Sequence, residues 1–178
     1  IGSNLARIGK GFGMEVVGFD THKNTTLAKQ TGLRYIGLKQ LFQRSHIISL
    51  HIPGTPLTER IINRTLLSQV KPGAILLNTA RGSIVDAKAV MKALDSGRLQ
   101  AYLTDVLDRE QYLRHQPREL TPKARAALKL QRELVRHPKV WVTPHVAHDT
   151  AEASQQILVH TLSVIEQFSR GRKISTII

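Results

Sequence analysis

The chain has 178 residues, 41% of them hydrophobic, and its 26 lysines and arginines against 13 acidic residues give a formal net charge of +13. This composition is that of one globular domain and argues against disorder, and no apolar run reaches the roughly 18 residues of a membrane helix. The absence of cysteine excludes disulfides, a thiolate nucleophile and a cysteine-based zinc site.

Short apolar runs alternate along the chain with longer amphipathic ones. The expected strands are Glu15–Phe19, Leu33–Ile36, Ile47–Leu50, Ala74–Asn78, Gln100–Thr104 and Val140–Thr143. The expected helices are Ser3–Gly11, Thr26–Gln30, Leu38–Gln43, Thr65–Val70, Asp86–Ser96, Pro122–Val135 and Thr150–Ser169. Most of the strands are rich in Ile, Val and Leu, as strands covered on both faces are. The alternation predicts an α/β fold built on a doubly wound parallel sheet.

Capping residues mark the ends of several of these helices. Asp86 stands where an N-cap is expected, Gly97 where a helix ends, and Pro122 in a first helical turn. The segment Leu107–Thr121 is polar, basic and irregular. It is therefore expected to be either a surface excursion or a flap over a site.

The amino-terminal end carries part of a dinucleotide-binding pattern. Gly2 precedes a helix and Asp20 follows the next strand 18 residues later, as the last glycine and the acid of G-x-G-x-x-G would. The helix N-terminus would then hold a pyrophosphate, and Asp20 the adenosine ribose, which favours NAD over NADP. The alternative is a helix–strand pair in which Asp20 only begins a turn. Because Ile1 is not a methionine, we expect that an upstream segment has been lost.

Three further residues combine into a chemical pattern. Arg81 follows a buried strand, Glu110 follows another by six residues, and His145 follows the last strand. Each residue by itself also fits a non-catalytic interpretation: Arg81 in a surface ion pair, Glu110 as a solvated loop acid and His145 as a structural histidine. Together they suit the reduction of a 2-keto acid. His145 would donate the proton, and Glu110 would stabilise the imidazolium form of His145. Arg81 would bind the substrate carboxylate and polarise the carbonyl.

Several segments in order resemble the D-isomer-specific 2-hydroxyacid dehydrogenase family, in its NAD-binding domain. They are Leu5–Met14, His51-Ile52-Pro53 with Thr55 and Thr58, Lys71-Pro72-Gly73-Ala74, Asn78-Thr79-Ala80-Arg81-Gly82, Thr104-Asp105-Val106 with Glu110, and Thr143-Pro144-His145. The resemblance implies a Rossmann-like domain that binds NAD. It also implies an oxidoreductase that transfers a hydride between nicotinamide and a small D-2-hydroxy acid or 2-keto acid.

The resemblance assigns roles to the matching positions. Arg81, Glu110 and His145 become the catalytic residues. The cofactor-binding residues become Ile1 and Gly2 at the pyrophosphate, Asp20 at the ribose, Ile52, Pro53 and Thr58 on the adenine side, and Thr79, Ala80, Arg81, Asp105 and His145 toward the nicotinamide. No metal site is implied.

The family pattern also sets the expected domain organisation. Residues 1–170 are expected to be the NAD-binding domain without its first strand, and residues 171–178 the start of a return to a substrate-binding domain that is otherwise absent. The isolated chain is therefore expected to be unstable and inactive. The 35 residues between Glu110 and His145 resemble the D-lactate and phosphite dehydrogenase branches more than the phosphoglycerate branch.

The alternatives are a phosphite dehydrogenase-like enzyme, or a non-catalytic NAD-sensing, nucleic-acid-binding or protein-binding module. The complete set of Arg81, Glu110 and His145 argues against the non-catalytic alternative. We expect a cytoplasmic protein that is a homodimer at full length, has a small 2-hydroxy or 2-keto acid as substrate, and binds neither nucleic acid nor membrane. The positive charge, densest from Arg114 to Arg136, is expected to form a solvated basic face that also attracts the anionic cofactor and substrate.

Overall fold

The structure is a computed structural model that describes residues 1–114 and 120–172. The chain divides into two compact units, Ile1–Pro144 and His145–Ile178. Residues 115–119, within the segment expected to be an excursion or flap, lie outside the described residues. So do residues 173–178, most of the predicted return to a substrate domain.

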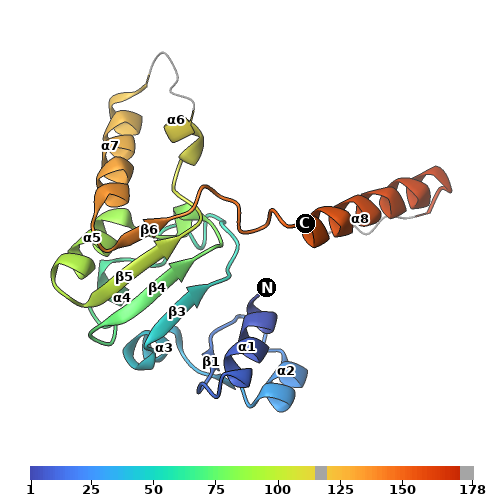
Figure 1. The fold of residues 1–178 in the computed structure, drawn as a ribbon, viewed down its shortest axis with the longest axis horizontal. Helices are drawn as coiled ribbons and strands as arrows, with labels where there is room; N and C mark the ends of the chain where they lie inside the picture. The colour runs from blue at the N-terminus through green and yellow to red at the C-terminus, as the bar shows by residue number, and fades with distance from the viewer. Residues whose placement is uncertain (115–119, 173–178) are drawn as a thin grey trace. The chain divides into compact units, whose positions relative to one another are not determined.

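The first unit contains a parallel sheet of four strands (Figure 1). These are β3 (Ile47–Leu50), β4 (Ala74–Asn78), β5 (Leu99–Thr104) and β6 (Val140–Val142), in the spatial order β3-β4-β5-β6. Leu76 stands in register with Ile48 on one side and Tyr102 on the other. The expected parallel sheet is therefore confirmed, and the carboxyl ends of its strands meet at one edge.

A separate pair of parallel strands lies in the amino-terminal part of the same unit. Here β1 (Val17–Gly18) pairs with β2 (Arg34–Tyr35), and the helices α1 (Gly2–Gly11) and α2 (Thr25–Thr31) pack against each other. In dinucleotide-binding folds the strand order is 3-2-1-4-5-6. The pair β2-β1 corresponds to strands 3 and 2 of that order, and the four-stranded sheet, which starts at β3, corresponds to the side that begins with strand 4. In the described chain β1 and β3 each pair along one edge only.

The main core fills the space between the four-stranded sheet and the helices on one of its faces. The helices α3 (Leu38–Arg44), α4 (Arg64–Leu67), α5 (Ala87–Asp95) and α7 (Pro122–Arg136) all contribute to this core, which contains Phe42, Leu76, Val90, Leu94 and Leu134. The opposite face is more open, because Ile47 and Trp141 in the outer strands are about half exposed. The alternation along each strand therefore directs one set of side chains into the core.

Local capping explains where the helices begin. The Asp86 carboxylate accepts the amide hydrogens of Lys88 and Ala89 at the start of α5, and the Thr121 hydroxyl accepts that of Ala124 at the start of α7. Pro122 occupies the first turn of α7, as expected.

Some boundaries differ from the sequence-based expectation. β1 and β2 have only two residues each, which pair with each other alone, and α4 ends at Leu67 instead of Val70. Two short helices had not been expected: the 3-10 turn η1 (Gly82–Ile84) and α6 (Glu110–Arg114). Both are too short to show an amphipathic period, although the acid in the first turn of α6 suits a helix N-terminus.

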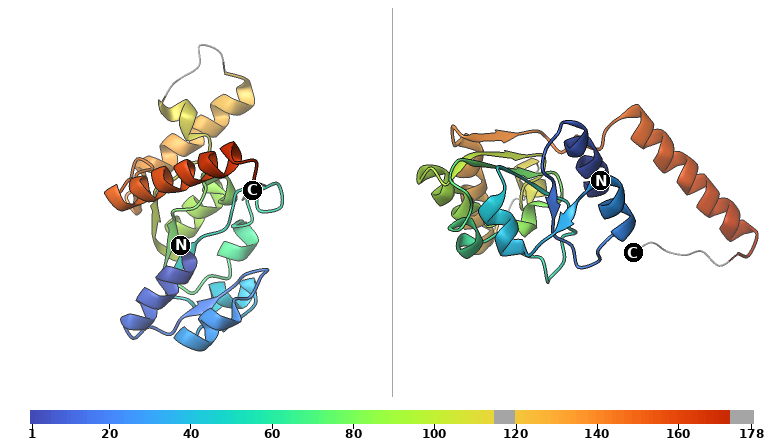
Figure 2. Two further views of the ribbon diagram at one scale, coloured as in Figure 1. Left: turned by 90° about the vertical axis from the view of Figure 1, so that its right-hand side faces the viewer. Right: turned by 90° about the horizontal axis from the view of Figure 1, so that it is seen from below.

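The second unit is dominated by one helix, α8 (Ala151–Ser169), visible as a single rod in each view of Figure 2. The Thr150 hydroxyl accepts the Ala153 amide hydrogen and caps this helix. None of its residues is buried. No helix in the described part of the chain combines the length and the apolar character that crossing a bilayer requires.

Candidate functional site

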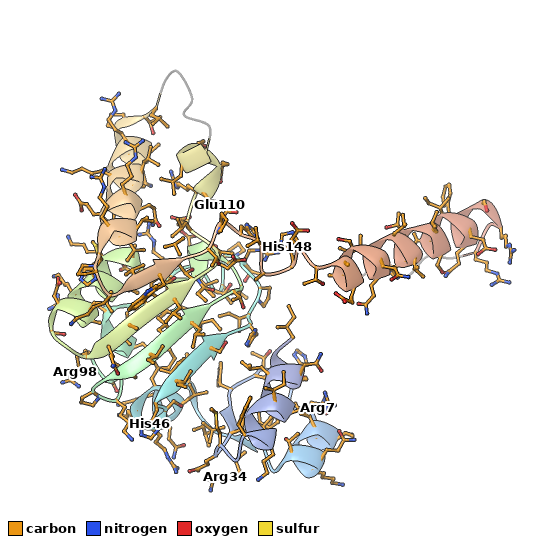
Figure 3. The ribbon with its side chains drawn as sticks, viewed as in Figure 1. Arg7, Arg34, His46, Arg98, Glu110 and His148 are labelled. Atoms are coloured by element: carbon orange, nitrogen blue, oxygen red, sulfur yellow. The ribbon has the colours of Figure 1, made fainter. Side chains whose placement is uncertain are left out.

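The carboxyl edge of the four-stranded sheet gathers most of the predicted site residues of the first unit. Ile52 and Pro53 follow β3, the Thr79–Arg81 segment follows β4, and Asp105 follows β5. In Figure 3 Glu110 lies near this edge, whereas Arg98 lies at the opposite end of the sheet. Ligands of doubly wound folds bind in the crevice outside the carboxyl ends of the strands. The sheet thus brings these side chains to the expected edge.

A buried asparagine shapes the turn that carries Arg81. Asn78 is fully buried at the end of β4, and its side-chain oxygen accepts the Ala80 amide hydrogen at 3.0 Å. Its side-chain nitrogen donates to the Arg81 carbonyl at 2.9 Å. Sequence reasoning had quoted Asn78 in the motif without giving it a role; an amide at the end of an otherwise apolar strand was the available signal.

The Arg81 side chain is exposed and its stem is tightly flanked. One guanidinium nitrogen donates to the Ala80 carbonyl at 2.7 Å. A methyl group added to Gly54 would lie 3.1 Å from the Arg81 Cγ, so Gly54 lets the loop after β3 approach this stem closely. The guanidinium is therefore available to a carboxylate at the sheet edge.

Gly82 joins the Arg81 turn to the segment that leads to Glu110. A Cβ at Gly82 would overlap the backbone of Leu107 and Asp108, so the two loops meet backbone to backbone. The Glu110 carboxylate accepts the Leu107 amide hydrogen at 3.3 Å, which ties the start of α6 to the same loop. Arg81 and Glu110 thus stand on two segments whose backbones approach each other closely at Gly82.

Asp105 is a buried carboxylate at the end of β5. Its backbone amide donates to the Asn78 carbonyl at 3.0 Å, and its carboxylate accepts a hydrogen bond from the Thr143 hydroxyl. Thr143 follows β6, so this pair connects the ends of two neighbouring strands. No role is expected of Thr143 from the sequence, although its place two residues before His145 was a usable signal.

The loop after β3 is closed by Thr58. Its hydroxyl donates to the Pro53 carbonyl at 2.6 Å and accepts the Thr55 amide hydrogen at 2.8 Å. Ile52 packs against the main core. These contacts give the loop a fixed shape along the edge that was predicted to hold the adenine side of a cofactor.

The amino end of α1 lies beside the end of β3. A Cβ at Gly2 would be 3.4 Å from the His51 side chain, and the His51 ring contacts the Ser49 hydroxyl at 2.9 Å. Burial lowers the pKa of His51, because the charged imidazolium loses hydration there. Ile1 is exposed as the N-cap residue of α1. The predicted pyrophosphate end is therefore a glycine at a helix N-terminus next to a neutral imidazole.

Asp20 lies at the carboxyl end of β1, and its side chain is exposed. Its carboxylate accepts the His22 amide hydrogen at 2.9 Å, which closes the turn after the strand. The turn that had been considered as an alternative is thus present, and Asp20 also occupies the strand end expected of a ribose-binding acid. Its cofactor role stays a prediction.

His145 begins the second unit. Its backbone adopts a left-handed conformation, with φ +60°, and its ring contacts that of His148 edge-on, with a centroid separation of 5.4 Å. The partnership of His145 with Glu110 and Arg81 stays a prediction. Within residues 1–114 and 120–172, no three His, Asp or Glu side chains are grouped as ligands of a metal ion.

Comparison with known proteins shows a consistent likeness. Residues 1–147 match the family model described as D-isomer specific 2-hydroxyacid dehydrogenase, NAD binding domain. D-lactate dehydrogenase of Treponema pallidum is 34% identical over 176 residues, covering 96% of this chain and 50% of that protein. D-lactate dehydrogenase of Lactobacillus delbrueckii subsp. bulgaricus is 32% identical over 99% of this chain and 52% of its own length.

Solved structures show the same likeness. D-lactate dehydrogenase from Aquifex aeolicus, complexed with NAD and lactic acid, matches with a TM-score of 0.83 and 34% identity, over 96% of this chain and 51% of that one. The NAD complex of the D-isomer specific 2-hydroxyacid dehydrogenase from Lactobacillus delbrueckii subsp. bulgaricus matches with a TM-score of 0.85 and 29% identity, over 100% and 53%. The expected Rossmann-like fold is confirmed. The chain spans about half the length of the curated relatives it matches.

Proposed function

This chain belongs to the D-isomer-specific 2-hydroxyacid dehydrogenase family through its NAD-binding domain, and on that premise we propose that it serves an NAD-dependent oxidoreductase of small D-2-hydroxy acids. The observation that carries the proposal is the joined pair of segments bearing Arg81 and Glu110 at the carboxyl edge of the sheet. The D-lactate dehydrogenases among its relatives support a substrate similar to D-lactate.

The residues that would hold NAD fit a dinucleotide. Gly2 leaves the amino end of α1 free of a side chain beside His51, where a pyrophosphate would meet the backbone amides. The exposed Asp20 carboxylate suits the adenosine ribose, and the loop fixed by Thr58 suits the adenine side. Thr79, Ala80 and Asp105 would lie toward the nicotinamide, which accepts or supplies the hydride.

The proposed chemistry divides three tasks among three side chains. Arg81 binds the substrate carboxylate through its guanidinium and holds C2 in position. His145 takes the hydroxyl proton when the hydroxy acid is oxidised, and returns it to the carbonyl oxygen in reduction. Glu110 stabilises the imidazolium that forms when His145 holds this proton and fixes the orientation of its ring.

The central test is His145→Ala in the full-length protein. We expect kcat to fall by roughly 10²–10⁴, because a general acid–base group usually contributes that much, while NADH binding followed by fluorescence stays close to that of the wild type. A loss of turnover below about tenfold would count against the acid–base role. The matched control is His160→Ala on α8, which should leave kcat unchanged.

A second test addresses the carboxylate site. Arg81→Lys keeps the charge and loses the paired hydrogen-bond geometry, so we expect a higher KM for 2-keto acids together with a lower kcat. Arg98→Lys is the control, because Arg98 lies at the opposite end of the sheet in Figure 3. Equal kinetics for the two variants would argue that Arg81 does not bind substrate.

The phosphite dehydrogenase-like alternative rests on the long segment between Glu110 and His145, which folds into α6 and α7. A panel of 2-keto acids with NADH, and of D-lactate and phosphite with NAD, separates the two enzymes.

We also propose that the full-length protein is a cytoplasmic homodimer. Light scattering of the purified protein would test the oligomeric state, and cell fractionation the location.

A further inference from the structure

Helix α7 carries a row of exposed cations along one side. Arg125, Lys129, Arg132 and Arg136 are spaced by four, three and four residues, and all are exposed. With 3.6 residues per turn this spacing places them in a single stripe, and a rise of 1.5 Å per residue makes the stripe about 16 Å long. Nitrogen-tipped side chains stand along α7 on the side away from the sheet in Figure 3.

Packing holds this stripe outward. The other side of α7 is buried and carries Ala124, Leu128, Gln131 and Leu134. Of these, Leu134 belongs to the main core. A helix buried along one side cannot turn about its axis to hide its charges. The stripe is therefore a fixed feature of the folded domain.

The neighbouring helix α5 widens the basic surface. It packs against α7 and exposes Lys88 and Lys92. Together the two helices carry seven lysines and arginines against two acids. Both acids already have cationic or histidine partners: Glu133 lies 3.9 Å from Lys129, and Asp95 lies 3.2 Å from His137.

Most of this charge has no ion-pair partner among the residues that the structure describes. No carboxylate of the described residues forms an ion pair with Arg125, Arg132 or Arg136. A concentration of unneutralised cations raises the local potential and attracts polyanions. We name six of the exposed cations of α5 and α7 the α5–α7 basic face: Lys88, Lys92, Arg125, Lys129, Arg132 and Arg136.

We propose that the α5–α7 basic face binds the phosphate backbone of duplex nucleic acid. Three of the four stripe residues are arginines, whose planar guanidinium pairs with phosphate oxygens through two hydrogen bonds. The stripe presents these groups at regular intervals along a rigid rod, as a repeating array of phosphates requires. Binding of this kind is independent of base sequence.

Other polyanions fit this face less well. Protein partners usually bury an apolar centre, and the stripe has no large apolar side chain among its cations. Membrane-surface helices insert an apolar side, which in α7 is packed inside the domain. Single-stranded nucleic acids stack on aromatic rings, and neither α5 nor α7 contains one.

The proposal revises the expectation that the chain has no nucleic-acid partner. That expectation rested on the absence of a nucleic-acid-binding motif beside the charge, whereas the structure shows four cations aligned along α7 and α5 packed beside that helix. The α5–α7 basic face lies on the helices, and the residues proposed for hydride transfer in the first unit follow the strand ends. Duplex binding and dehydrogenase activity are therefore separate properties with separate tests.

The experiment measures fluorescence anisotropy of a labelled 20-base-pair duplex of random sequence against the purified protein, between 50 and 200 mM salt. We expect micromolar binding at low salt and a slope of log K against log salt of about −3 to −4, since each neutralised phosphate contributes about −0.9. The triple variant Arg125→Gln, Arg132→Gln, Arg136→Gln should weaken binding more than tenfold at 50 mM salt and make the slope shallower by about 2.7.

The matched control is Lys10→Gln, Lys29→Gln, Lys39→Gln, which removes the same charge from exposed positions of α1, α2 and α3. Circular dichroism melts verify that both triple variants fold. An equal loss of affinity in the control would show that net charge alone binds the duplex and would overturn the proposal. Absence of duplex binding would also overturn it, as would tighter binding to polyglutamate, single strands or anionic vesicles.

Discussion

The two halves of the first unit are built from the same elements but have very different cores. The half that contains β3 to β6 has a continuous core of buried side chains, with Phe42, Leu76, Val90 and Leu94 fully enclosed. The amino-terminal half, with β1, β2, α1 and α2, has a small buried apolar cluster of Ala6, Leu27 and Leu33. Because burial of apolar surface is the main stabilising term, the first of these halves holds the fold together.

The difference follows from strand pairing. Each inner strand of the four-stranded sheet has a neighbour on both sides, whereas β1 and β2 have only each other. A two-stranded sheet is marginally stable by itself. Apolar side chains of α1, among them Leu5, Ile8 and the adjoining Phe12, remain exposed. The proposed pyrophosphate and ribose end of the site thus stands on the weaker half, and the proposed Arg81–Glu110 end on the stronger.

The largest expected effect is in the strong half. Leu76→Ala in β4 empties a fully buried position between two strands, and such a change costs about 2–5 kcal/mol of unfolding free energy. Chemical denaturation measures the loss. Leu158→Ala on α8, an exposed position, is the control and should change stability by less than about 0.5 kcal/mol. A cost below about 1 kcal/mol for Leu76→Ala would contradict the assignment of the main core.

Gly82→Ala tests how firmly the Arg81 and Glu110 segments are joined. The added methyl group would overlap the Leu107–Asp108 backbone, so we expect a loss of about 1–3 kcal/mol or more, measured by chemical denaturation. We also expect a fall in kcat of the full-length enzyme, because both side chains would be displaced. Gly11→Ala, where a methyl group meets nothing within 4 Å, is the matched control. Unchanged stability in Gly82→Ala would show that the loops can move apart.

Leu27→Ala addresses the weak half. Leu27 is buried in the small cluster with Ala6 and Leu33, and we expect a loss of about 2 kcal/mol that is confined to this half. Hydrogen exchange should show faster exchange for amides of α1, α2 and β2, and unchanged protection in β4 and β5. If β4 and β5 lose protection equally, the two halves unfold together and the contrast between them disappears.

The smallest expected effect concerns His51, where the two halves meet beside Gly2. Burial lowers the pKa of His51, so the folded state favours the neutral ring and the unfolded state binds the proton more readily. The stability from this group is present above the ordinary pKa of about 6.5 and is lost as the pH falls below it. The melting temperature should fall less between pH 7.5 and 5 in His51→Asn than in the wild type. An equal fall in melting temperature in both proteins would show that His51 does not cause this pH dependence.

The sequence by itself determined the parallel α/β fold, because the short runs of Ile, Val and Leu and the helix-start signals at Asp86 and Pro122 are local. It also brought Arg81, Glu110 and His145 into one hypothesis, because residues that follow parallel strands share an edge of the sheet. β3 and β4 were predicted to the residue. The ends of β1 and β2 were not, because strand length depends on a partner that is remote in the sequence.

Only the tertiary structure decided which residues hold the site in shape. Asn78 bridges Ala80 and Arg81, and Thr143 forms a hydrogen bond with Asp105. Gly82 lacks a Cβ that would overlap the Leu107 backbone. The same is true of the α5–α7 basic face, whose cations come from two helices with β5 and α6 between them in the chain. Composition and periodicity report what each segment prefers by itself. Close backbone approach and shared hydrogen bonds arise only when segments far apart in the chain are packed together.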